Sequence, residues 1–160
     1  MTTTDWTTDT KGTGQYAEIN GLKLYFETVG TARPLVLLHG GLGSGEMFGP
    51  TLAELAERHQ VILPDLQGHG RTADIDRPID IQLMADDIAG LIDHLKLDKP
   101  DVVGYSLGGG VALLTAVKYP DKVGRLVAAS AHAWRHAIPP EMLAQQAQVN
   151  AAAAEFLKDT

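Results

Sequence analysis

Apolar residues follow two alternating patterns along the chain: short continuous runs, and longer stretches in which they recur at helical spacing. A short continuous run is typical of a strand that is buried on both faces of a parallel sheet. Helical spacing over Thr51–Arg58 and in the segment after residue 106 predicts helices between such strands. The runs that predict strands are Pro34–Leu38, Val61–Leu63, Asp101–Val103 and Leu126–Ala129.

The stretch from Ile81 to Leu95 has the clearest helical pattern. Its apolar residues lie on one stripe, whereas Asp86, Asp87 and Asp93 lie off that stripe. This distribution predicts an amphipathic helix that packs one face on a sheet. The stripe consists of Ile81, Met84, Ala85, Ile88, Leu91, Ile92 and Leu95.

An antiparallel hairpin is predicted before the first buried strand, because Tyr16–Ile19 and Leu22–Thr28 flank an Asn-Gly pair. Strands then alternate with helices, which indicates an α/β fold with a mostly parallel sheet and helices on both faces. We expect a flexible tail over 1–14, a core over 15–138, and a helical segment over 139–160.

Composition limits the kind of protein. The 160 residues are 44% hydrophobic and 21% charged, which is typical of a single globular domain, and the net charge of −7 argues against a nucleic-acid or anionic-membrane partner. The absence of cysteine excludes disulfides and thiolate catalysis, and no metal or organic cofactor is expected. Residues 1–14 contain no apolar signal core, so we expect a cytoplasmic protein.

The candidate chemistry lies in the segment Gly104-Tyr105-Ser106-Leu107-Gly108, between a predicted strand and a predicted helix. A chain that turns from strand to helix around one residue is strained there, and the residues two positions either side must lack side chains. The turn exposes a hydroxyl at a helix N-terminus, where free N–H groups can stabilise an oxyanion. Ser106 is therefore the predicted nucleophile. Nucleotide binding is disfavoured, because these glycines precede no Lys-Ser/Thr pair and form no G-x-G-x-x-G pattern.

Two further segments accompany this turn: Leu37-Leu38-His39-Gly40-Gly41 follows the first buried strand, and the segment 64–72 follows the second. Together the three segments resemble the α/β-hydrolase superfamily, especially small esterases, lactonases and peptidase-like members with a helical cap. The resemblance runs from about residue 16 to at least residue 131. It implies the N-terminal part of an α/β-hydrolase fold that is incomplete at its C-terminus, with the start of the cap at 139–160.

The resemblance also implies roles for particular residues. The backbone N–H groups of Gly41 and Leu107 would hold an oxyanion formed at Ser106. Loop organisation rather than catalysis is implied for Asp65, His69 and Arg71, and is also the stronger interpretation of His39. The substrate pocket would be lined by His39, Gly40, Leu42, Tyr105 and His132.

A serine nucleophile needs a base, which a carboxylate normally orients. In this superfamily both groups follow the serine on later loops. The histidines after Ser106 are His132 and His136, and Asp121 belongs to a turn expected at the opposite end of the sheet. The expected acid–histidine pair is therefore absent. We expect a fragment, a truncated chain, or a chain completed at the exposed edge of the Leu126–Ala129 strand by another chain or a second copy.

The leading hypothesis is a serine hydrolase that acts on a small ester, lactone or related acyl compound through an acyl-enzyme on Ser106. Two alternatives stay open: a catalytically incomplete hydrolase-fold module that binds a small molecule, and a cofactor-free perhydrolase or haloperoxidase. A serine at this position disfavours dehalogenase and epoxide-hydrolase chemistry, which use a carboxylate nucleophile.

Overall fold

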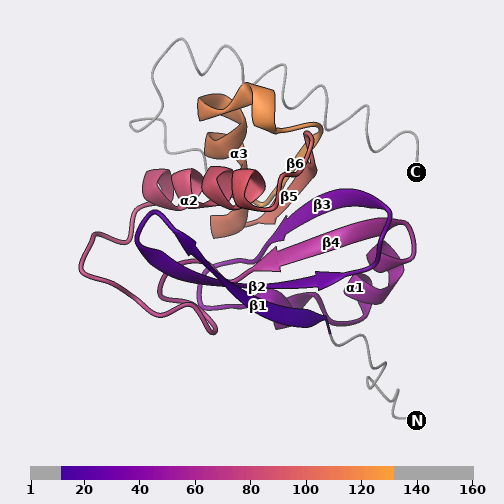
Figure 1. Cartoon of the computed structure of the whole chain (residues 1–160), viewed down its shortest axis with the longest axis horizontal. Helices are drawn as coiled ribbons and strands as arrows, with labels where there is room; N and C mark the ends of the chain where they lie inside the picture. The colour runs from indigo at the N-terminus through magenta and orange to yellow at the C-terminus, as the bar shows by residue number, and fades with distance from the viewer. Residues whose placement is uncertain (1–11, 132–160) are drawn as a thin grey trace.

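A computed structural model describes residues 12–131 of the chain. In this range, strands and helices alternate after an opening hairpin (Figure 1). The strands are β1 (Thr13–Ile19), β2 (Leu22–Val29), β3 (Arg33–Leu38), β4 (His59–Pro64), β5 (Asp101–Tyr105) and β6 (Leu126–Ala129). The helices are α1 (Gly49–Ala56), α2 (Ile81–His94) and α3 (Leu107–Lys118), with short 3-10 turns η1 (Gly45–Phe48) and η2 (Pro120–Lys122).

The strands form one mixed sheet in the order β1-β2-β4-β3-β5-β6. β1, β2 and β4 pair antiparallel, whereas β4, β3, β5 and β6 pair parallel. The predicted α/β fold with a mostly parallel sheet and an N-terminal antiparallel hairpin is therefore confirmed. Within residues 12–131, β6 pairs only with β5 and forms an edge of the sheet. That another chain pairs with this edge stays a prediction.

Side chains on alternate positions of the central strands enter two different cores. Val36 and Leu38 of β3 join the larger core, which also contains the buried faces of α2 and α3. Leu35 and Leu37 join a smaller core on the other face, beneath Leu52 of α1. Helices therefore cover both faces of the parallel part of the sheet, which explains why the strands are continuously apolar. Figure 1 shows α2 and α3 side by side over one face.

The hairpin turn has the backbone that its sequence predicts. Asn20 and Gly21 both have positive φ, at 51° and 79°, as a two-residue turn with a right-handed strand twist requires. Thr13 pairs with Thr28, so β1 begins inside the stretch 1–14 that was expected to be a tail. The first part of β1 has exposed side chains and no apolar pattern, and its backbone pairing left no signal in the sequence.

Asp87 on α2 has surroundings that the apolar pattern of the helix does not predict. Its side chain is buried, although it lies off the apolar stripe. The Arg77 guanidinium forms an ion pair with this carboxylate, and the Asn20 amide donates to it at 3.1 Å. A buried charge is tolerated where it is paired and hydrogen-bonded. Asp87 therefore joins α2 to the hairpin turn and to the loop before α2.

A buried carboxylate, Asp101, joins the amino ends of three neighbouring strands. It belongs to β5 and forms ion pairs with Arg33 of β3 at 3.2 Å and with Arg125, just before β6, at 2.7 Å. The Arg125 backbone N–H also donates to it at 3.0 Å. Burial alone would raise the pKa of Asp101, but hydrogen bonds from Arg125 and the charges of Arg125 and Arg33 hold the pKa below its usual range.

No helix within residues 12–131 has both the length and the apolar content needed to cross a membrane.

The ion pairs of Asp101 predict a pH-dependent contribution to stability. Asp101→Asn removes the charge that faces two arginines, so we expect the free energy of unfolding at pH 7 to fall by about 2 kcal/mol. Because the pKa of Asp101 is lowered by folding, this stabilisation is present above the pKa of an unfolded aspartate. It is lost as pH falls through the folded-state pKa. Urea unfolding at pH 7 and at about pH 3 measures both effects.

Asp98→Asn is the matched control. Asp98 is exposed and lies three residues before Asp101, and its substitution removes the same charge. We expect a change within about 0.5 kcal/mol for this variant. Equal stability losses in the two variants would contradict the role assigned to Asp101.

Candidate active site

Ser106 is the single residue between the end of β5 and the start of α3. Its backbone has φ 52° and ψ −112°, a conformation that residues with a side chain rarely adopt. Two hydrogen bonds hold it there: its N–H donates to the Ala129 carbonyl at 2.9 Å, and its carbonyl accepts from the Gly110 N–H at 3.1 Å. The structure thus has the tight strand-to-helix turn that the sequence pattern predicts.

The glycines on either side of this turn lie too close to other backbone atoms to carry side chains. A Cβ built on Gly104 would lie 2.1 Å from the Gly108 carbonyl oxygen. A Cβ built on Gly108 would lie 2.4 Å from the carbonyl oxygen of Leu38 and 2.5 Å from that of His39. Glycine at 104 lets the first turn of α3 pack against β5, and glycine at 108 lets it pack against the end of β3.

The His-Gly-Gly segment after β3 lies beside this turn. The Gly108 N–H donates to the His39 carbonyl at 3.1 Å. A Cβ built on Gly40 would lie 3.6 Å from the Ser106 Cβ, and a Cβ built on Gly41 would lie 3.9 Å from the Leu107 Cβ. Segments that are far apart in the sequence are therefore in contact around Ser106.

Two backbone N–H groups close to Ser106 have no partner in the part of the chain that the structure describes. Within residues 12–131, no acceptor takes the N–H of Gly41 or that of Leu107. The Leu107 N–H is at the first turn of α3, where a helix leaves its donors unsatisfied. By contrast, the Gly40 N–H donates to the Met47 sulfur at 3.2 Å. The two amides that were predicted to hold an oxyanion are thus available for hydrogen bonding.

His39 uses both of its ring nitrogens to hold backbone. It is fully buried, its Nδ1–H donates to the Gly40 carbonyl at 2.7 Å, and its Nε2 accepts from the Leu66 N–H at 3.0 Å. Burial lowers the pKa of His39, which keeps the imidazole neutral. A ring with both nitrogens engaged fixes the loop after β3 and has no nitrogen left to act as a base.

Asp65 and Arg71 connect the loop after β3 with the loop after β4. The buried Asp65 carboxylate accepts from the Gly45 N–H and from the Arg71 N–H, both at 2.9 Å. The Arg71 guanidinium lies 3.4 Å from the same carboxylate and also pairs with Glu46. His69, in the second loop, holds its own turn through Nδ1 and the Gln67 carbonyl at 2.8 Å.

The side chains predicted to line a pocket have different surroundings. Tyr105 and Leu42 are exposed beside the turn, and a Cβ on Gly40 would lie 3.0 Å from the Tyr105 ring. His132 lies outside the described residues, as does the segment 139–160. Sequence reasoning missed Met47, which is also exposed and contacts Gly40. It belongs to no periodic pattern, so no sequence signal pointed to it.

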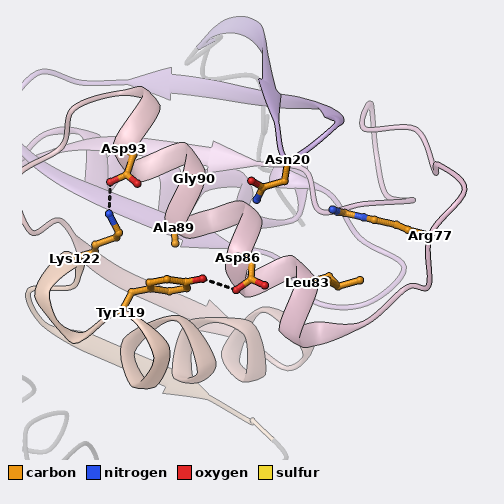
Figure 2. Close-up of a pocket in the computed structure, with 9 residues that line it drawn as sticks. All are labelled: Asn20, Arg77, Leu83, Asp86, Ala89, Gly90, Asp93, Tyr119 and Lys122. Carbon is orange, nitrogen blue, oxygen red and sulfur yellow. Dashed lines mark hydrogen bonds and ion pairs between the residues drawn. The ribbon is translucent and has the colours of Figure 1, made fainter.

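A separate cleft of about 490 Å³ lies at the other end of α3. Figure 2 shows polar groups of the cleft facing one another: Tyr119 donates to Asp86 at 2.7 Å, and Lys122 pairs with Asp93. Ser106 and Tyr119 cap opposite ends of α3, whose 12 residues span about 18 Å at 1.5 Å per residue. The cleft is therefore distinct from the site around Ser106.

The described residues thus form an α/β sheet with a strained serine between a strand and a helix. The sequence matches the family model for the alpha/beta hydrolase fold over residues 33–159. The chain therefore belongs to the alpha/beta hydrolase family.

Relatives with assigned names are hydrolases of several kinds. The chain is 40% identical over 120 residues to the soluble epoxide hydrolase of Corynebacterium sp. (strain C12), covering 73% of this chain and 41% of that protein. It is 34% identical over 114 residues to the 2-hydroxymuconate semialdehyde hydrolase of Pseudomonas sp. (strain CF600), covering 67% and 39%. The chain thus spans about two fifths of the length of these relatives.

Solved structures agree on the fold. The epoxide hydrolase CorEH superposes with a TM-score of 0.69 at 39% identity, over 71% of this chain and 40% of that one. The enol-lactonase from Burkholderia xenovorans LB400 superposes with a TM-score of 0.70 at 27% identity, over 73% and 46%.

The contacts at the turn predict opposite effects for two neighbouring glycines. Gly108→Ala places a Cβ against two carbonyl oxygens, so we expect the free energy of unfolding to fall by about 3 kcal/mol or more. A Cβ on Gly110 meets nothing within 4 Å, so Gly110→Ala should stabilise α3 by about 0.5–1 kcal/mol. Thermal or urea unfolding of both variants measures the difference. Similar stabilities would show that α3 does not start where the structure has it.

Proposed function

We propose that the chain carries the nucleophile and the oxyanion-binding amides of a serine hydrolase that acts on a small ester, lactone or related acyl compound. Membership in the alpha/beta hydrolase family supports a hydrolase, and the arrangement around Ser106 supports acyl chemistry. The observation on which the proposal depends is the strained Ser106 at the start of α3, beside the free N–H groups of Gly41 and Leu107.

In the proposed reaction, Ser106 Oγ attacks the acyl carbon, and the carbonyl oxygen takes the negative charge. The N–H groups of Gly41 and Leu107 donate to this oxygen, and the positive end of α3 favours the charge. A base takes the Ser106 hydroxyl proton during the attack and gives it to the leaving oxygen as the acyl C–O bond breaks. This leaves an ester on Ser106, which water then hydrolyses. His39 is committed to the loop, so the proposal takes its base from outside residues 12–131.

The serine favours acyl over epoxide chemistry in this proposal, although one relative is named an epoxide hydrolase. Attack of a serine oxygen on an epoxide carbon would form an ether, which water does not cleave under mild conditions. A carboxylate nucleophile would instead form an ester, which water can hydrolyse. Ser106 therefore favours substrates that leave an acyl group on the enzyme.

A fluorophosphonate probe tests the nucleophile directly. We expect labelling of the 160-residue chain at Ser106, and we expect Ser106→Ala to lower the labelling by about a hundred-fold or more, to background. Peptide mass spectrometry locates the modified residue. Ser130→Gly is the matched control, because Ser130 also has positive φ, at 52°, and should tolerate glycine with labelling unchanged.

A substrate panel then separates the reaction classes. Small p-nitrophenyl esters and a γ-lactone should be hydrolysed in a Ser106-dependent way, whereas styrene oxide should not. If the chain is neither labelled nor active, the inert binding module is the correct interpretation. Epoxide opening without ester hydrolysis would contradict the acyl mechanism.

A further inference from the structure

Met47 lies in η1, close to the loop that contains Gly40 and Gly41, and the proposed mechanism does not use it. Its thioether sulfur accepts a hydrogen bond from the Gly40 N–H at 3.2 Å. Met47 is nevertheless 46% exposed, whereas Met84 in the core is 1% exposed. The side chain whose sulfur supports the loop beside Ser106 is therefore partly open to solvent.

The backbone of two loop residues lies beside this sulfur. A Cβ built on Gly43 would lie 3.3 Å from it, and the Gly43 N–H donates to the Gly40 carbonyl at 3.2 Å. The turn that contains Met47 is anchored by the Gly45 N–H, which donates to the buried Asp65 carboxylate at 2.9 Å. A change at the sulfur must therefore be taken up by Met47 itself or by the Gly40 backbone.

An exposed thioether reacts with hydrogen peroxide without a cofactor. A sulfur lone pair attacks one peroxide oxygen, the S–O bond forms as the O–O bond breaks, and the second oxygen leaves as water after proton transfer. The sulfur loses two electrons, and the peroxide gains them. The product is methionine sulfoxide, a polar group that methionine sulfoxide reductases convert back to the thioether.

We propose that Met47 is a sulfoxidation site, and that its oxidation displaces the Gly40–Gly41 segment and thereby lowers the reactivity of Ser106. The oxygen forms on one of the two sulfur lone pairs. On the lone pair that faces the Gly40 N–H, the 3.2 Å gap leaves no room for it, and on either one the larger and more polar sulfoxide replaces the weak thioether acceptor that holds this N–H. Gly40 has no Cβ, so its backbone turns easily. The next N–H along the chain belongs to Gly41, which moves with it.

The effect on the loop stands on the contacts of Met47 alone, whereas the effect on Ser106 rests on the proposed function. When a backbone N–H is displaced from the oxyanion, the enzyme loses a large part of the rate enhancement that this N–H provides. We therefore expect oxidation to slow fluorophosphonate labelling of Ser106 by about ten-fold.

The experiment compares the 160-residue chain with Met47→Leu, each before and after treatment with dilute hydrogen peroxide. Peptide mass spectrometry should find sulfoxide at Met47 while Met84 stays reduced. Hydrogen exchange over residues 39–47 should become faster in the oxidised chain. Labelling of Ser106 should slow in the parent chain, recover after treatment with both methionine sulfoxide reductases, and be insensitive to peroxide in Met47→Leu. This variant keeps the other methionines and so controls for their oxidation.

Each other outcome overturns the proposal. Met47 that oxidises no faster than Met84 is not a sulfoxidation site. If Met47 is oxidised and hydrogen exchange over residues 39–47 is unchanged, the loop does not depend on the sulfur. If peroxide lowers the labelling of Ser106 equally in Met47→Leu, the effect comes from another residue. If the untreated chain is not labelled, the proposed function fails, and the exchange measurement still decides the role of Met47 in the loop.

Discussion

The close packing of backbone on backbone at the start of α3 is the constraint on which the rest of the structure depends. Gly108 lies against the carbonyl groups at the end of β3, and its N–H donates to the His39 carbonyl. This contact aligns the end of β3 with the turn after β5. It also brings together Gly41 and Leu107, whose N–H groups have no acceptor within residues 12–131. A single methyl group at Gly108 would push the start of α3 away from the end of β3.

The strain at Ser106 is stabilised by packing on both sides of the turn. A backbone in this region of φ and ψ costs on the order of 1–3 kcal/mol, which the surrounding structure must offset. Val111 and Ala112 of α3 are fully buried in the larger core, and β5 is held between β3 and β6. At the amino ends of the same strands, Asp101 joins β3, β5 and β6 through Arg33 and Arg125. The strained Ser106 therefore follows a strand, β5, that is held at its amino end by the Asp101 ion pairs and along its length by β3 and β6.

Local physics explains which features could be predicted from the sequence. The Asn20-Gly21 turn, the continuously apolar strands and the glycines around Ser106 each depend on residues close together in the chain. The buried ion pairs could not be predicted in this way, because Asp101 meets Arg33 from 68 residues away. Asp87 is buried because of its distant partners, and Met47 matters through a contact with Gly40 that no periodic pattern records.

The proposed oxyanion donors at Ser106 are main-chain N–H groups, so the sequence acts on them through the residues that orient the backbone. In the proposed mechanism, the oxyanion is held by peptide N–H groups, which no substitution at Gly41 or Leu107 removes, except to proline. Their direction is set by other residues: by the missing Cβ of Gly108, by His39 and Asp65 in the neighbouring loops, and by the sulfur that takes the Gly40 N–H. Preorganised dipoles are effective because they do not reorient during the reaction. The residues that control this chemistry are therefore those that hold the loops, and a change at a side chain that never touches the substrate can alter the rate.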